Sequence, residues 1–162
     1  MEQILKQATL LATRLHEGQV DKSGKPYILH PIRVSNSLSD VKCKILAVLH
    51  DVLEDCEITA DELVEMGIPQ ELVDRLLLLT KQKGERYFDY IDRVKQDDLT
   101  RQVKLADLKD NMDLTRLYPT LDISRLEDDV YLKETLSKKD LKRYRKYQKA
   151  KAILEGLIEV VD

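Results

Sequence analysis

The sequence contains few residues that interrupt helices or cross-link the chain. Its 162 residues include five glycines, four prolines, one phenylalanine and no tryptophan. So few chain-breaking residues favour long helices joined by short loops. The two cysteines, Cys43 and Cys56, neither make up a disulfide framework nor form the CxxC pair of a metal site. We therefore expect reduced thiols and a cytoplasmic protein.

Long hydrophobic runs are absent as well. No apolar stretch approaches the ~18–20 residues that a membrane-spanning helix needs. The N-terminal segment MEQILKQATLLATRLHEG is amphipathic and contains acids, unlike the hydrophobic part of a secretory signal. The net charge of −3 gives no general argument for nucleic-acid binding. What remains is a charge-rich protein with 43% hydrophobic and 35% charged residues.

Apolar residues recur at helical spacing along most of the chain, and no segment keeps the strict alternation of a β-strand. We therefore predict an all-α fold and, from the length, a single domain over residues 1–162. The capping-box pattern TADE begins one helix at Thr59, and Pro69 begins the next. The other predicted helices cover residues 2–17, 31–38, 40–55, 85–97, 98–117, 123–136 and 138–160.

One predicted buried helix ends in charged side chains. The segment AVLHDVLEDCEIT leaves an apolar run and then places His50, Asp51, Glu54 and Asp55 within six residues. At 100° per residue, these four side chains share an arc of about 140° on a helix. Burying such groups is costly unless they are paired or bind a metal ion. We therefore predict that this helix end faces a cleft.

The chemistry of this cluster suits a divalent metal ion. His50 and Asp51 offer a nitrogen and an oxygen ligand, a set that favours Mn²⁺, Fe²⁺ or Zn²⁺. His30 is the candidate third ligand and Asp107 the candidate fourth. Asn111 follows Asp107 by one turn on the same helix face.

Each of these residues also has a simpler interpretation. A His-Asp pair is common, and Glu54 and Asp55 could be solvated charges at a helix end. Asp107 could lie on the surface of an amphipathic helix. A carboxylate at a helix C-terminus opposes the helix dipole, which favours a bound cation there. For the remaining histidine, His16, we favour a capping or packing role at the end of the first helix.

Taken together, the motifs resemble those of HD-domain metal-dependent phosphohydrolases. More narrowly, they resemble the alarmone hydrolases of the Rel–Spo type, including small single-domain members. The resemblance is carried in order by YILHP, VLHD, ED and KLAD followed by Asn111, and GQVDKSGKPYILHP strengthens the narrower match. It runs from about residue 8 to about residue 117. A helical C-terminal extension over about 120–162 matches less distinctively.

The resemblance implies an HD-domain helical bundle around one Mn²⁺. The metal ligands would be His30, His50, Asp51 and Asp107. Glu54 and Asp55 would position and activate water, while Asn111 and Lys22 would contact the substrate. The implied reaction removes pyrophosphate from the 3′ position of guanosine tetra- or pentaphosphate. By charge alone, Lys25 and Lys104 are further candidate phosphate contacts, and solvation explains these two equally well.

Two positions depart from the family pattern. The family usually carries Arg at the position of Asp21, where the guanidinium is expected to stack on guanine. It also usually carries Arg directly after the KLAD aspartate, where this chain has Leu108. The metal and water chemistry is thus retained in the sequence, while the expected base contact is not. We predict modest discrimination between guanine and adenine.

The segment 138–151 holds eight basic residues and one acidic residue. Such a helix could touch nucleic acid or a polyphosphate. We favour instead a solvated face paired with the acidic remainder of the fold, with no nucleic-acid partner and no membrane.

Three functions remain open. The chain could be an alarmone pyrophosphohydrolase, a phosphohydrolase for another nucleotide or phosphoester, or a non-catalytic module that senses a nucleotide. The Glu54–Asp55 pair argues against the last, because a pure binder needs no water-activating carboxylates.

Overall fold

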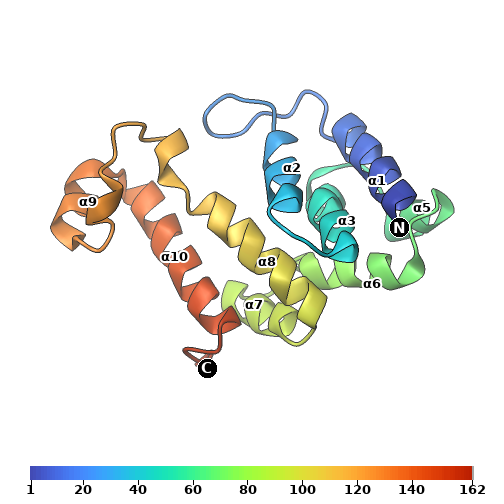
Figure 1. The fold of residues 1–162 in the computed structure, drawn as a ribbon. Coiled ribbons are helices and arrows are strands. Elements are labelled where there is room, and N and C mark those ends of the chain that lie inside the picture. The colour runs from blue at the N-terminus through green and yellow to red at the C-terminus, as the bar shows by residue number, and fades with distance from the viewer. Residues whose placement is uncertain (162) are drawn as a thin grey trace.

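The computed structural model describes residues 1–161 as a bundle of helices (Figure 1). Within that range there is no β-strand beyond one isolated bridge between Val20 and Pro26. The predicted all-α fold is confirmed. The α-helices are α1 (Glu2–Leu15), α2 (Leu29–Asn36), α3 (Val41–Leu49), α4 (Val52–Asp55), α5 (Ala60–Glu65), α6 (Gln70–Leu79), α7 (Tyr87–Lys95), α8 (Asp98–Asn111), α9 (Asp129–Thr135) and α10 (Lys138–Leu154), and two 3₁₀ turns cover Leu114–Arg116 and Ile123–Arg125.

Helix α3 lies at the centre of the bundle. Asp40 caps its start by accepting a hydrogen bond from the backbone N–H of Cys43, and every residue from Ile45 to Leu49 is buried. Because its second half is apolar on all sides, α3 packs against α1, α2, α6 and α8 at once. Figure 1 shows α8 running between α3 and the C-terminal helix α10. The residues that follow α3 therefore lie next to α2 and α8.

The prediction of one continuous helix over 40–55 is wrong. Helix α3 ends at Leu49 and α4 begins at Val52, so His50 and Asp51 occupy a break. The cause is local. The carbonyl of Ala47, which would accept the N–H of Asp51 in a continuing helix, lies 2.5 Å from His50 Nδ1 and accepts the backbone N–H of His50. The side chain of His50 thereby ends the helix, and its other ring nitrogen faces Asp51 and Asp107.

Other predicted boundaries are also too long, because short side chains cap the chain earlier. Helix α8 ends at Asn111 rather than at 117, and Asp113 then caps a separate 3₁₀ turn. The helix predicted over 123–136 is split, since Asp128 caps α9 by accepting the N–H of Tyr131. The predicted starts at Thr59 and Pro69 are confirmed, the former with a complete capping box.

Two hydrophobic clusters support the structure. The larger one contains most of the buried residues of α1 to α8 together with the end of α10. The smaller one joins α9 and the start of α10 to the segment after α8, through Leu114, Leu121, Leu132, Leu136 and Tyr144. The extent of the domain, predicted as residues 1–162, stays a prediction, and Asp162 lies outside the described residues.

Between residues 1 and 161, no helix has the length and apolar character to cross a membrane. Cys43 is buried and Cys56 is half-buried, and neither belongs to a disulfide among residues 1–161. Their reduced state stays a prediction. The cytoplasmic location stays a prediction.

Candidate active site

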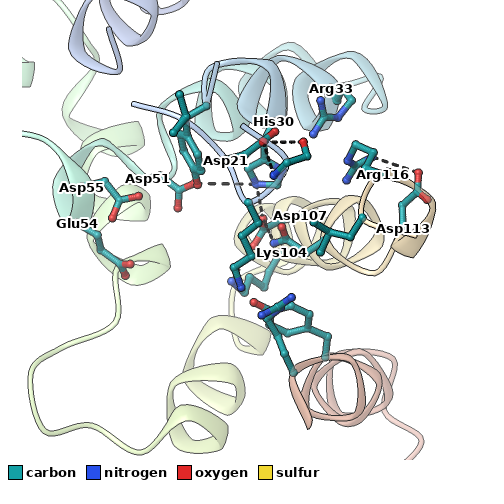
Figure 2. Close-up of a pocket in the computed structure, with 18 residues that line it drawn as sticks. Asp21, His30, Arg33, Asp51, Glu54, Asp55, Lys104, Asp107, Asp113 and Arg116 are labelled. Carbon is teal, nitrogen blue, oxygen red and sulfur yellow. Dashed lines mark hydrogen bonds and ion pairs between the residues drawn. The ribbon is translucent and has the colours of Figure 1, made fainter. Parts of the chain in front are cut away.

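Three side chains from separate elements converge beside the break after α3, and Figure 2 shows two of them, His30 and Asp107. His30 comes from the first turn of α2, His50 from the end of α3, and Asp107 from α8. The Oδ1 atom of Asp107 lies 2.9 Å from His30 Nε2 and 3.2 Å from His50 Nε2. All three residues are buried, and they form a group able to hold a metal ion.

The second nitrogen of each imidazole fixes which way the ring faces. Nδ1 of His30 lies 2.6 Å from Asp110 Oδ2, and Nδ1 of His50 lies 2.5 Å from the Ala47 carbonyl. Because both acceptors lack a proton, each Nδ1 donates one, so a metal ion that displaces the proton of Nε2 finds a lone pair there. Within the described residues, the buried Nε2 of His50 has no hydrogen-bond partner. Two inward lone pairs beside a carboxylate suit a divalent ion.

Asp51 completes the predicted set. Its Oδ2 lies 3.0 Å from His50 Nε2 and 4.0 Å from His30 Nε2. The hydroxyl of Tyr27 donates a hydrogen bond of 2.5 Å to the same oxygen. Tyr27 therefore fixes the orientation of the carboxylate that the helix break presents.

The carboxylates dominate the electrostatics of this group. Burial lowers the pKa of His50, but Asp51 and Asp107 outweigh it and raise that pKa well above its usual range. Burial would raise the pKa of Asp51, but His50 outweighs it and lowers that pKa to about 2. The site thus holds ionised carboxylates away from water, where a cation is strongly favoured.

Glu54 and Asp55 lie at the pocket side of α4, beside this group (Figure 2). Glu54 Oε1 accepts a hydrogen bond of 2.7 Å from the backbone N–H of Lys81. Burial is the main cause that raises the pKa of both Glu54 and Asp55, and the charge of Asp51 adds to it. A carboxylate with a raised pKa is a better proton acceptor, which suits a general base.

A pocket of about 550 Å³ opens over the cluster, a volume within the range of small-molecule sites. It reaches from Glu54 and Asp55 to Arg33 and Arg116. In Figure 2 the two carboxylates lie on one side of His30 and the two arginines on the other. The cationic side chains along it are Lys22, Arg33, Lys104, Arg116 and Arg143. A pocket of this volume with these cationic side chains suits an anionic ligand of nucleotide size.

Two predicted substrate contacts bond directly to Asp107. Lys104 Nζ donates to Asp107 Oδ2 at 2.8 Å, and Asn111 Nδ2 donates to Asp107 Oδ1 at 2.9 Å. Both residues line the pocket. Burial lowers the pKa of Lys104, but Asp107 outweighs it and raises that pKa well above its usual range. The ammonium is therefore a permanent charge beside the cluster.

The loop before α2 carries two lysines that were predicted to contact the substrate, and only one of them lines the pocket. Asp21 and the exposed Lys22 line the pocket, whereas the exposed Lys25 does not. One oxygen of Asp21 accepts hydrogen bonds from the N–H and hydroxyl of Ser23 and from the N–H of Lys25. In place of the family's Arg, this chain therefore has a carboxylate that holds the turn of its own loop.

Leu108 and His16 are the two remaining residues about which the sequence made a prediction, and both are buried. Leu108 is fully buried in the larger hydrophobic cluster, so the second departure from the family pattern lies in the core. His16 caps the end of α1 and is buried, with Nδ1 at 2.8 Å from Gln19 Oε1. The capping and packing role predicted for His16 is confirmed.

Sequence reasoning missed several residues of the pocket. Asp110 binds both His30 and Arg33, and its spacing of three residues from Asp107 on α8 was a usable signal. Arg143 and Tyr147 of the basic segment 138–151 line the pocket, so the solvated face that we favoured describes only part of that helix. No local signal identifies these two residues, because their position depends on how α10 packs.

Part of this chain is similar in sequence to known enzymes. No protein-family model matches the chain. Over 121 residues it is 35% identical to a guanosine-3′,5′-bis(diphosphate) 3′-pyrophosphohydrolase of Vibrio cholerae, and it is equally similar to the bifunctional (p)ppGpp synthase/hydrolase SpoT of Escherichia coli K12. The matched segment makes up 66% of this chain but only 17% of each relative. The chain thus spans about a sixth of those enzymes.

The fold has a counterpart among solved structures. A metazoan ortholog of SpoT, described as hydrolysing ppGpp and acting in starvation responses, superposes with a TM-score of 0.61 at 21% identity. The match covers 96% of this chain and 97% of that one. By sequence and by fold, this chain is a relative of the Rel–Spo type alarmone enzymes, as its motifs predict.

Proposed function

We propose that this protein is a metal-dependent phosphohydrolase that removes pyrophosphate from the 3′ position of guanosine tetra- or pentaphosphate. The observation that carries the proposal is the convergence of His30, His50 and Asp107 at the base of a cation-lined pocket, with Glu54 and Asp55 beside them. The relatives that share this segment are named for that reaction or for alarmone metabolism.

His30, His50, Asp51 and Asp107 would hold the metal ion. The mixed nitrogen and oxygen donors suit Mn²⁺, which we propose as the natural ion. When bound, a divalent ion supplies positive charge that polarises a phosphoryl oxygen. Asp110 and the Ala47 carbonyl hold the two imidazoles in the tautomer that this role needs.

The chain's own carboxylates would handle the water. Glu54, helped by Asp55, accepts a proton as the water oxygen bonds to the phosphorus attached to the ribose 3′ oxygen. The bond between that phosphorus and the 3′ oxygen breaks, and the 3′ oxygen leaves as a hydroxyl by taking up the proton that Glu54 accepted. Guanosine tetraphosphate would thus give guanosine diphosphate and pyrophosphate. Lys22, Asn111 and Lys104 would position the phosphates and ribose, a task that dominates phosphoryl transfer.

A second enzymatic function is favoured by one observation. Asp21 is engaged in its own loop and offers no cation to stack on guanine, so a phosphohydrolase for another nucleotide or phosphoester is the alternative. A non-catalytic sensor is disfavoured by the Glu54 and Asp55 carboxylates that line the pocket, because a pure binder needs no water-activating pair.

The test is a turnover screen of the Mn²⁺-loaded protein with guanosine and adenosine alarmones, ordinary nucleotides, NADPH and simple phosphoesters. We expect the alarmones to have the highest kcat/KM. A clear preference for a substrate without a 3′-diphosphate would favour the alternative enzyme, and binding without any turnover would favour the sensor.

A further inference from the structure

One side chain ties the loop between α1 and α2 to the end of α4. Gln19 Nε2 donates a hydrogen bond of 3.0 Å to the backbone carbonyl of Asp55, and it lies 3.7 Å from Cys56 Sγ as a second acceptor. Asp55 is the last residue of α4 and Cys56 is its C-cap. Gln19 therefore holds the end of the short helix that carries Glu54 and Asp55.

The end of α1 fixes the orientation of the Gln19 amide. Its Oε1 lies 2.8 Å from Nδ1 of His16, the buried residue that caps α1. Because the Asp55 carbonyl can only accept, the amide nitrogen faces Asp55 and the amide oxygen faces His16, whose Nδ1 then donates. Gly18 turns the chain between His16 and Gln19 with a φ of +84°, a conformation that favours glycine. The amide is thus held from both sides.

Helix α4 needs such support because it spans only Val52–Asp55. A helix of one turn is not stable by itself in water. The carboxylate of Glu54 has its own support, the hydrogen bond from the backbone N–H of Lys81. Within the part of the chain that the structure describes, the carboxylate of Asp55 accepts no hydrogen bond. The position of the Asp55 side chain therefore depends on its backbone, which Gln19 holds.

We propose that Gln19 is a positioning residue for the reaction and that it acts by holding Asp55 in place beside the attacking water. The inference rests on the proposed function, which gives the position of Asp55 its consequence. The backbone carbonyl of Gln19 also accepts the N–H of Tyr27 at 2.9 Å, and the Tyr27 hydroxyl holds Asp51. Gln19 thus joins the loop that carries Lys22 to the carboxylates that handle the water.

The first variant is Gln19→Met, which keeps the length of the side chain and removes both ends of the amide. Hydrogen exchange at the amides of Asp55 and Cys56 should become faster, because the end of α4 is released. In the Mn²⁺-loaded protein, kcat for guanosine tetraphosphate should fall by up to roughly a hundredfold, the cost of a small misplacement at a reacting centre. The metal content and KM should change little, because the backbone bonds of the loop remain.

The matched control is Gln96→Met. It removes an amide that also donates to a backbone carbonyl, that of Asp92 at 3.1 Å, at the end of α7. Neither kcat nor the exchange at Asp55 should change.

A double-mutant cycle separates positioning from a general role in the fold. In an Asp55→Asn background, adding Gln19→Met should lower kcat little further, because the residue through which Gln19 acts is already disabled. A merely structural role predicts the same fold loss in both backgrounds.

Three results would overturn the inference: wild-type exchange at Asp55 and Cys56 in Gln19→Met, a wild-type kcat in that variant, or equal fold losses in the two backgrounds of the cycle. Failure of the proposed function has a different signature. A wild type that leaves guanosine tetraphosphate unchanged would refute that function, and faster exchange in Gln19→Met would still support the link between Gln19 and Asp55.

Discussion

The two sides of the main pocket hold their charged groups in different ways. On the cluster side, His30, His50 and Asp107 are at most 5% exposed and come from three helices that pack on one another. On the loop side, Lys22 is exposed, and Asp21 is tied only to neighbours within its own turn. Changes on the cluster side must disturb the core, whereas changes at Asp21 disturb only hydrogen bonds within its own loop. We therefore expect the chemistry to depend on the cluster side and the base preference to depend on the loop side.

The largest expected effect comes from removing a buried ligand. His50→Ala should lose the single divalent ion per chain that we expect in the wild type, and turnover with it. Thermal stability should also fall, because an ion that binds only the folded state stabilises it. Elemental analysis after dialysis measures the ion.

The matched control for this variant is His16→Ala, which removes a buried imidazole outside the cluster. It should lower the melting temperature and keep the ion. Equal metal contents in His50→Ala and the wild type would refute the ligand assignment.

The next effect separates chemistry from metal binding on the same side. Glu54→Gln should keep the ion and the hydrogen bond from Lys81, since the amide oxygen can still accept. Its kcat should fall roughly 10²–10⁴-fold, the usual contribution of a positioned acid–base group.

The pH profile gives an independent reading of Glu54. Because the pKa of Glu54 is raised, the wild-type rate should fall as the pH drops through that raised value. Glu54→Gln should lose this acidic limb. A variant with the wild-type rate and profile would exclude Glu54 as the base.

A variant of Asp110 tests whether metal binding depends on the carboxylate that holds the His30 ring in place. Asp110→Asn removes the charge that faces His30 Nδ1 and Arg33. Metal affinity should fall about 10–100-fold, the usual cost of losing such a partner. Asp113→Asn removes a carboxylate that pairs with Arg116 and makes no contact with an imidazole among the described interactions, so it should bind the ion normally. Equal affinities in the two variants would mean that Asp110 does not support the site.

The smallest effect is expected on the loop side. Asp21→Arg should raise kcat/KM for the guanosine alarmone by up to roughly thirtyfold, the range of a cation stacked on an aromatic ring, and raise it less for the adenosine counterpart. Asp21→Asn keeps an oxygen that can hold the loop turn and serves as the control for lost charge alone. Strong guanine selectivity in the wild type, unaltered by Asp21→Arg, would show that another part of the pocket reads the base.

The sequence predicted which residues form the cluster more accurately than it predicted the bounds of the helices that carry them. Ordered motifs identified His30, His50 and Asp107, which the fold does bring together. The break at His50 and Asp51 was missed because apolar periodicity continues from Leu49 to Val52 and conceals the capture of the Ala47 carbonyl. A side chain that bonds to its own helix is invisible to a pattern of hydrophobic residues.

The remaining pocket residues differ in whether the sequence could have identified them. Asp110 could have been found, because it lies on the same face of α8 as Asp107. Arg143 could not, since eight basic residues share its segment and only the packing of α10 on α7 and α8 selects the one that faces the pocket. Position in three dimensions, rather than residue type, separates this arginine from solvated neighbours such as Lys142.

The most direct test of the central claim is product identification. The Mn²⁺-loaded protein is mixed with guanosine tetraphosphate, and the phosphorus species are followed by ³¹P nuclear magnetic resonance, with a metal-free sample alongside. The account predicts guanosine diphosphate and intact pyrophosphate in equal amounts, formed only when the ion is present. Release of orthophosphate as the first product, or unchanged substrate in a sample that demonstrably holds the ion, would contradict it.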